Sequence, residues 1–119
     1  MKAKEVHINF SGKKKKILAN IVPRYLEGIG LMFRRESKAK PLLFSFDNIR
    51  EPIHSLFVFF NFYAIWMDKR FNVIEVKKVR PWSFYVNCRR EFSYLLEIPV
   101  IYLEKEARRD LVDVLERFK

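Results

Sequence analysis

The feature that most constrains the fold is an apolar run at residues 56–67, which only Asn61 interrupts. Apolar side chains occupy both alternating sets of positions in this run, so a strand formed here needs cover on both of its faces. The run is too short to cross a bilayer as a helix. It therefore predicts one buried strand or two central strands, with a turn at the polar residues 68–70 that follow.

The start of the chain has the pattern of a β-hairpin. Residues 5–10 alternate between polar and apolar side chains, which places the three apolar ones on one face of a strand. Residues 17–22 are apolar and β-branched enough to return as the partner strand. We expect a cluster of four lysines at the tip of this hairpin, formed by Lys13, Lys14, Lys15 and Lys16.

The rest of the chain predicts more strands and a terminal helix. Residues 24–35 have apolar side chains at helical spacing, but two glycines limit them to a short, irregular helix. Residues 47–52 have the composition of a loop. An amphipathic helix is predicted at residues 103–118, where apolar side chains recur every three or four positions. Further strands are expected at residues 42–46, 72–79 and 92–98. Together these elements predict a single α+β domain spanning residues 1–119, mainly antiparallel β with a C-terminal helix.

Charge and composition narrow the partners and the compartment. The formal net charge is +10, and residues 1–103 hold all of the excess, with nineteen bases against nine acids. A field of that sign attracts phosphates or acidic proteins. With one cysteine and no apolar leader at its start, the chain has the pattern of a cytoplasmic protein. The absence of glutamine and the 32% of charged residues are typical of a thermophile.

The basic clusters are the candidate binding residues. Cations on one face bind phosphates, and neighbouring exposed aromatic rings would let the bases of a single strand stack. The alternatives are that the rings belong to the core and the lysines are merely solvated, or that the domain binds a small molecule, an acidic protein or a second copy of itself through its terminal helix. The nucleic-acid-binding candidates are Lys13, Lys14, Lys15, Lys16, Arg34, Arg35, Lys77, Lys78, Arg80, Trp82, Tyr85, Arg89 and Arg90.

Six short segments, taken in order, carry a resemblance to a known family. They are GLMFRR at 30–35, PLLFSF at 41–46, HSLFV at 54–58, IWMD through VIEV at 65–76, RPWSFY at 80–85 and YLLEIP at 94–99. The chain resembles the domain-of-unknown-function family 192, also called uncharacterised protein family 0127, in its archaeal form. The resemblance implies a curved sheet or partly closed barrel with no established activity, and it supplies no catalytic residues. Tyr63 stands where bacterial members tend to have an aspartate, so no role of that aspartate is carried over.

No constellation of residues predicts catalysis. A dyad of Cys88 with His54 would need a base beside the thiol and a third member, and no third member can be named. Asp47 and Glu51 are a loosely placed acidic pair without histidine or cysteine at metal-ligand spacing. The glycines also lack the spacing and the following lysine of a phosphate-binding loop. We therefore expect a non-enzymatic binding module with no metal or cofactor, and a Cys88-based enzyme is the weakest alternative.

Overall fold

A computed structural model describes residues 2–23, 35–49, 58–83 and 86–118, and its main feature is one six-stranded sheet. The strands lie in the order β1-β2-β3-β6-β4-β5. All neighbouring pairs are antiparallel except β2 and β3, which pair in parallel over two residues. The strands are β1 (Lys2–Phe10), β2 (Lys13–Ile21), β3 (Leu42–Ile49), β4 (Phe62–Met67), β5 (Val73–Val79) and β6 (Phe92–Pro99).

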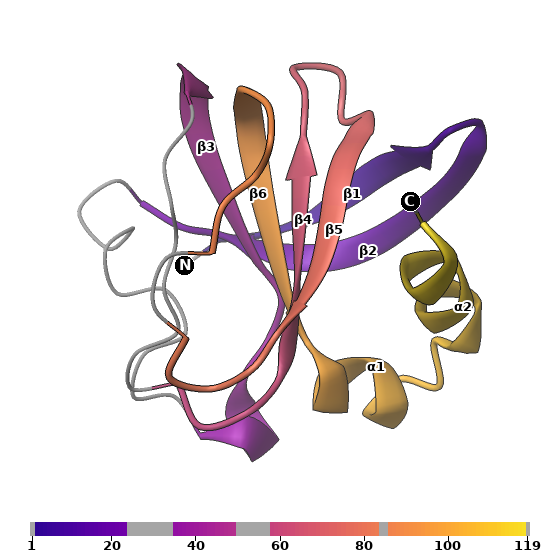
Figure 1. Cartoon of the computed structure of the whole chain (residues 1–119). Helices are drawn as coiled ribbons and strands as arrows, with labels where there is room; N and C mark the ends of the chain where they lie inside the picture. Colours follow the sequence, from indigo (N-terminus) through magenta and orange to yellow (C-terminus); the bar gives the residue numbers. More distant parts are fainter. Residues whose placement is uncertain (1, 24–34, 50–57, 84–85, 119) are drawn as a thin grey trace.

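The sheet curls until its two edge strands meet. In Figure 1, β3, β6, β4 and β5 run side by side, and the long β1–β2 hairpin runs across them. The backbone N–H of Asn9 in β1 donates to the carbonyl of Phe71, just before β5, at 3.0 Å. The side chain of Asn9 also donates to that of Asn72 at 2.9 Å. The fold is thus a curled half-barrel sheet of mostly antiparallel strands with helices at the C-terminus, which confirms the predicted α+β class.

The second half of the apolar run, strand β4, is buried on both faces, as its composition predicts, whereas Phe59 in the first half is 60% exposed. All six residues of β4 are buried. Tyr63, Ile65 and Met67 pack with the C-terminal helices on what we call the helix-side face of the sheet. The intervening residues, among them Trp66, point the other way and pack in a second cluster, on what we call the loop-side face. Residues 56 and 57 of the run lie outside the described residues.

The predicted terminal helix is two helices. Helix α1 (Val100–Lys105) begins directly after β6, and α2 (Arg109–Arg117) follows a sharp turn. Ala107 in that turn has a left-handed backbone with φ of 51°, and the N–H of Arg108 donates back to the carbonyl of Leu103 at 2.9 Å. Because both helices put their apolar side chains on the same sheet, an apolar spacing of three or four cannot distinguish them from one continuous helix.

Two further predictions need correction. The four lysines Lys13 to Lys16 are not a loop at the hairpin tip, because β2 begins at Lys13 and the turn consists of Ser11 and Gly12 alone. Gly12 has a positive φ of 100°, and its N–H donates to the side chain of Asn9 at 2.7 Å, so the turn closes without the lysines. Strand β3 also continues to Ile49, through the first three residues predicted as a loop, with a register shift after Ser45; the rest of that loop lies outside the described residues. The helix expected at residues 24–35 lies outside the described residues, apart from Arg35.

Candidate nucleic-acid interface

The four lysines of β2 point alternately to the two faces of the hairpin. Successive side chains of a strand point in opposite directions, so Lys13 and Lys15 share the helix-side face with the buried Ile17. Lys14 and Lys16 point the other way, are exposed, and lie opposite Asn9 and His7 of β1. The four lysines are consecutive in the sequence, but in the structure they are divided into two pairs on opposite faces.

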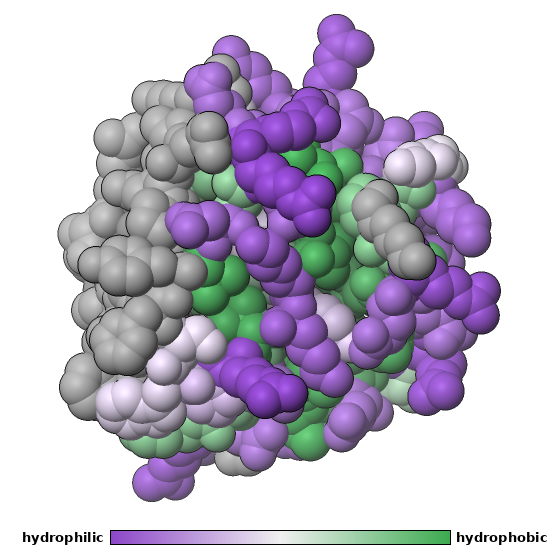
Figure 2. Space-filling model, in the orientation of Figure 1, coloured by the Kyte–Doolittle hydropathy of each residue, from purple (hydrophilic) through white to green (hydrophobic). Residues whose placement is uncertain are grey.

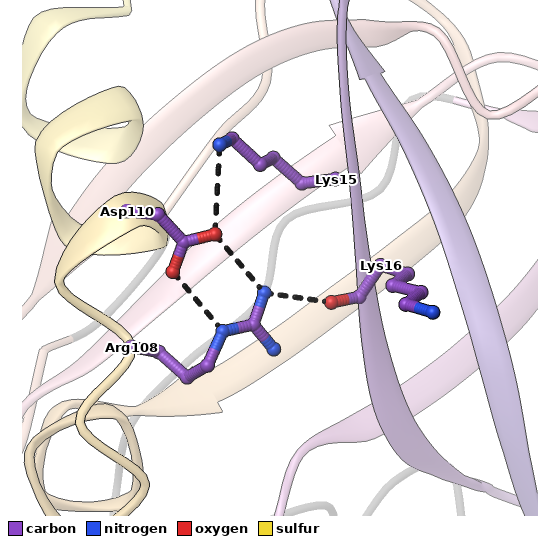
Figure 3. Close-up of polar contacts among 4 residues, drawn as sticks. All are labelled: Lys15, Lys16, Arg108 and Asp110. Atoms are coloured by element: carbon purple, nitrogen blue, oxygen red, sulfur yellow. Dashed lines mark hydrogen bonds and ion pairs between the residues drawn. The ribbon is translucent and has the colours of Figure 1, made fainter.

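Lys15 takes part in holding the terminal helix on the hairpin (Figure 3). Its Nζ lies 3.5 Å from a carboxylate oxygen of Asp110, in the first turn of α2. The guanidinium of Arg108 donates to the same carboxylate at 3.1 and 3.3 Å and to the backbone carbonyl of Lys16 at 2.9 Å. The hydrogen bond from Arg108 holds the pKa of Asp110 below its usual value, although burial opposes the shift. The charge of Lys15 is thus offset inside the protein.

Three candidates around β5 are also paired with carboxylates, namely Lys77, Lys78 and Arg89. Lys77 lies 3.5 Å from Glu75 on the same strand, and its ammonium donates to the backbone carbonyl of Asn87. The guanidinium of Arg89 lies 3.9 Å from the carboxylate of Glu75, which also accepts the N–H of Arg89 at 2.9 Å.

The neighbouring Lys78 points to the opposite face, where its Nζ lies 3.9 Å from Glu116 of α2 and 5.8 Å from the centre of the Tyr63 ring. The cations of β5 therefore form no common patch with one another.

The remaining candidates that the structure describes are separate from the hairpin. Trp82 is 46% exposed, and its ring packs edge-to-face against Phe59 at 5.7 Å. In Figure 1 the connection between β5 and β6, which contains Trp82 with Arg80 and Arg90, runs along the left side, whereas the hairpin turn lies at the upper right. Arg35 is exposed just before a short 3-10 helix, η2 (Glu36–Lys38), and Arg34 and Tyr85 lie outside the described residues. The structure therefore does not bring Trp82 to the lysines of the hairpin.

The β1–β2 hairpin is nevertheless the most concentrated positive segment. Residues 2–21 hold six lysines and a single acid, Glu5, so this hairpin carries +5 of the net charge of +10. Glu5 lies 3.3 Å from the imidazole of His7. Within the described part of the chain, no carboxylate is paired with Lys14 or Lys16. The outward face of the hairpin therefore presents cations that the described part of the protein does not neutralise.

Catalytic and metal alternatives gain no support from the described residues. Cys88 is buried, and its pKa is raised, mainly by desolvation, which disfavours the nucleophilic thiolate. His54, its predicted partner, lies outside the described residues. No group of three or more potential metal-ligating side chains occurs in residues 2–23, 35–49, 58–83 and 86–118. Those residues also contain no helix with the length and hydrophobicity needed to cross a membrane.

The sequence did not predict that several polar groups are buried on the loop-side face. Glu97 is 6% exposed on β6, and burial raises its pKa to about 8. The indole Nε1 of Trp66 and the hydroxyl of Ser93 are buried, and neither has a hydrogen-bond partner among the residues that the structure describes. The alternation of β6 could have placed Glu97 on the same face as Leu95, but nothing local in the sequence shows that this face is covered.

This geometry defines the chain as a small α+β protein built on a curled half-barrel sheet. The UPF0127 protein PH1112 of Pyrococcus horikoshii is 29% identical to it over 72 residues, or 60% of this chain and 62% of the relative. This match confirms the resemblance to uncharacterised protein family 0127. The chain spans about three fifths of the length of that relative. No protein-family model matches the chain.

Solved structures support the fold. A candidate transcription regulator from Sinorhizobium meliloti aligns with a TM-score of 0.71 at 17% identity, over 88% of this chain and 85% of its own. A protein of unknown function from Novosphingobium aromaticivorans aligns with the same TM-score at 12% identity, over 88% of this chain and 79% of its own. At such low identity these likenesses concern the fold alone.

Proposed function

We propose that this protein binds a polyanion, single-stranded nucleic acid, through the outward face of the β1–β2 hairpin. The observation that carries the proposal is the pair Lys14 and Lys16, two exposed cations with no carboxylate partner among the described residues, in the segment that holds +5 of the net charge. The description of one structural neighbour as a candidate transcription regulator agrees with a nucleic-acid partner but says nothing of this chain's residues.

The geometry of a strand suits repeated phosphate contacts. Side chains two positions apart on one face lie about 7 Å apart along the strand, so Lys14 and Lys16 form a short, regular row of cations. Their pairing with β1 fixes the backbone that carries them, since the ladder runs without interruption from the turn to Lys2. Each phosphate contact releases condensed counterions, so binding is expected to weaken steeply with salt. Such contacts do not depend on sequence.

The test is a titration of a fluorescently labelled single-stranded oligonucleotide at several salt concentrations. The wild-type affinity should fall linearly on logarithmic axes as salt rises. The double variant Lys14→Ser/Lys16→Ser should lower the steepness of that line by about 1.4, or 0.7 for each lost phosphate contact. It should leave the melting temperature unchanged, because the helix contact made by residue 16 uses its backbone carbonyl and not its side chain.

The matched control is Lys38→Ser/Lys40→Ser, which removes the same charge from two exposed positions outside the hairpin. It should keep most of the wild-type affinity and salt dependence. Equal losses in the two double variants would show that net charge alone governs binding. If the wild-type protein fails to bind the oligonucleotide even at low salt, about 20 mM, the proposed function is wrong.

A further inference from the structure

A groove lies where the turn of the hairpin meets the last turn of α2. It encloses about 230 Å³. On the same side of the molecule, Figure 2 shows further hydrophobic surface between β5 and α2, framed by hydrophilic side chains, although no residue of β5 lines the groove. The volume is below the 300 to 1,000 Å³ typical of sites for drug-sized ligands, so the groove has room for a single small ring system. It is lined by Phe10, Ser11, Lys13, Asp113, Val114, Arg117 and Phe118.

The groove is lined by two aromatic rings and by charged side chains. Phe10 and Phe118 meet edge-to-face with ring centres 5.9 Å apart; Phe10 is buried, and Phe118 stays partly exposed. Lys13 and Arg117 also line the groove, and neither pairs with a carboxylate in the described part of the chain. Asp113 is already partnered by Arg109, 3.8 Å away and one helical turn earlier. A ligand with a flat ring and an attached anion matches these surroundings.

We propose that this groove takes one base of a bound single strand, with the neighbouring phosphate held between Lys13 and Arg117. The inference rests on the proposed function and names the part of the strand that the protein reads. The partly exposed ring of Phe118 offers the face on which a base stacks. The carboxylate of Asp113 accepts hydrogen bonds, so it favours a base with an exocyclic amino group, such as cytosine.

The groove lies next to the end of the hairpin that carries the outward-facing lysines. Lys13 directly precedes Lys14, and the two side chains point to opposite faces at the first residues of β2. A strand whose phosphates follow Lys16 and Lys14 outward along β2 therefore reaches the turn at Ser11 and Gly12, beside the groove. The groove would supply, beside the hairpin turn, the aromatic platform that the sequence predicted at Trp82.

The experiment compares two labelled strands of equal length and charge, one of deoxycytidine and one with abasic sites throughout. Wild-type protein should bind the deoxycytidine strand about 5- to 150-fold more tightly, as expected for one stacked base. Phe118→Leu keeps an apolar side chain against Phe10 but removes the ring, and should reduce that ratio to about one while leaving the affinity for the abasic strand unchanged. Phe59→Leu removes an exposed ring elsewhere and should keep the wild-type ratio.

The outcomes separate the two proposals. If wild-type protein binds both strands with equal affinity, the groove takes no base, and phosphate binding by the hairpin stands. If Phe118→Leu leaves the preference for deoxycytidine intact, the base is read elsewhere and the groove proposal fails. If neither strand binds at low salt, the proposed function and the groove proposal fail together. The groove proposal is supported if the ratio of the two affinities is near one in Phe118→Leu alone and the thermal stability of that variant is unchanged.

Discussion

The buried carboxyl of Glu97 should make the stability of the folded protein depend on pH. Glu97 lies on β6, a central strand, directly opposite Leu42 of β3 and Ala64 of β4. Both of these neighbours are fully buried and apolar. In the described part of the chain no cation lies within ion-pair distance of the Glu97 carboxyl. Removal from water disfavours the ionised form, and burial raises its pKa from 4.5 to about 8.

The sign of the effect follows from proton binding in the two states. Between pH 4.5 and 8 the folded protein keeps the Glu97 proton and the unfolded chain releases it. The folded state then binds one more proton, so stability is fully present below the unfolded pKa and is lost as pH rises through the folded pKa. The loss is about 1.4 kcal/mol per pH unit, or on the order of 3 kcal/mol between pH 5.5 and 7.5. A domain of this size should lose roughly 10 °C in melting temperature over that interval.

The assay is thermal or urea unfolding of the wild type and of Glu97→Gln at about pH 5.5, 6.5 and 7.5. These values lie in the pH range over which the ionisation of Glu97 should change the stability. Glutamine has nearly the same shape and does not ionise, so the variant should be the more stable protein at pH 7.5, and the difference should shrink as pH falls. Subtracting the two curves removes the contribution of groups common to both. A difference that is constant with pH would show that Glu97 has the same pKa folded and unfolded, and the reasoning from burial would be refuted.

Two further predictions concern the terminal helix and the cysteine. Asp110→Ala removes the carboxylate that joins α2 to Lys15 and Arg108, and should cost about 1 kcal/mol at pH 7 for a pair of half-exposed contacts. Because the folded pKa of Asp110 is lowered, its contribution is present above the ordinary aspartate pKa and is lost as pH falls, so urea unfolding should show little difference from the wild type at about pH 2.5. Cys88 should react with a thiol reagent far more slowly in the folded protein than in guanidinium, since it is 4% exposed with a raised pKa; equal rates would contradict its burial.

Much of the fold could be predicted because burial leaves a clear mark on the sequence. The apolar residues of β4 occupy both alternating positions, and the structure buries all of them. The alternation in β1 likewise predicts its buried face correctly. The break at Ala107 could not be predicted, because α1 and α2 share one apolar spacing and the turn depends on a left-handed residue that is not glycine. The closure between Asn9 and Asn72 also leaves no local signal, since it joins residues 63 positions apart.

The candidate binding residues were harder to predict, because the function of a charge depends on its neighbours in space. Nothing in the sequence distinguishes Lys15 and Lys77 from Lys14. In the structure, however, Lys15 pairs with Asp110 of a distant helix, and Lys77 pairs with Glu75, two residues earlier on the same strand. The strand period of two could have divided the lysines correctly once β2 was extended back to Lys13. Phe118 was assigned only to the apolar side of a helix, and its place in the groove depends on the packing of α2 against the hairpin turn.

The most direct test of the account is a map of backbone amide chemical shifts in isotope-labelled protein, recorded as a single-stranded oligonucleotide is added at low salt. The largest changes are predicted along the first residues of β2, from Lys13 to Lys16, with a second group at Arg117 and Phe118. Changes confined to the connection around Trp82, with the hairpin unaffected, would contradict the claim that the outward cations of the hairpin bind the strand.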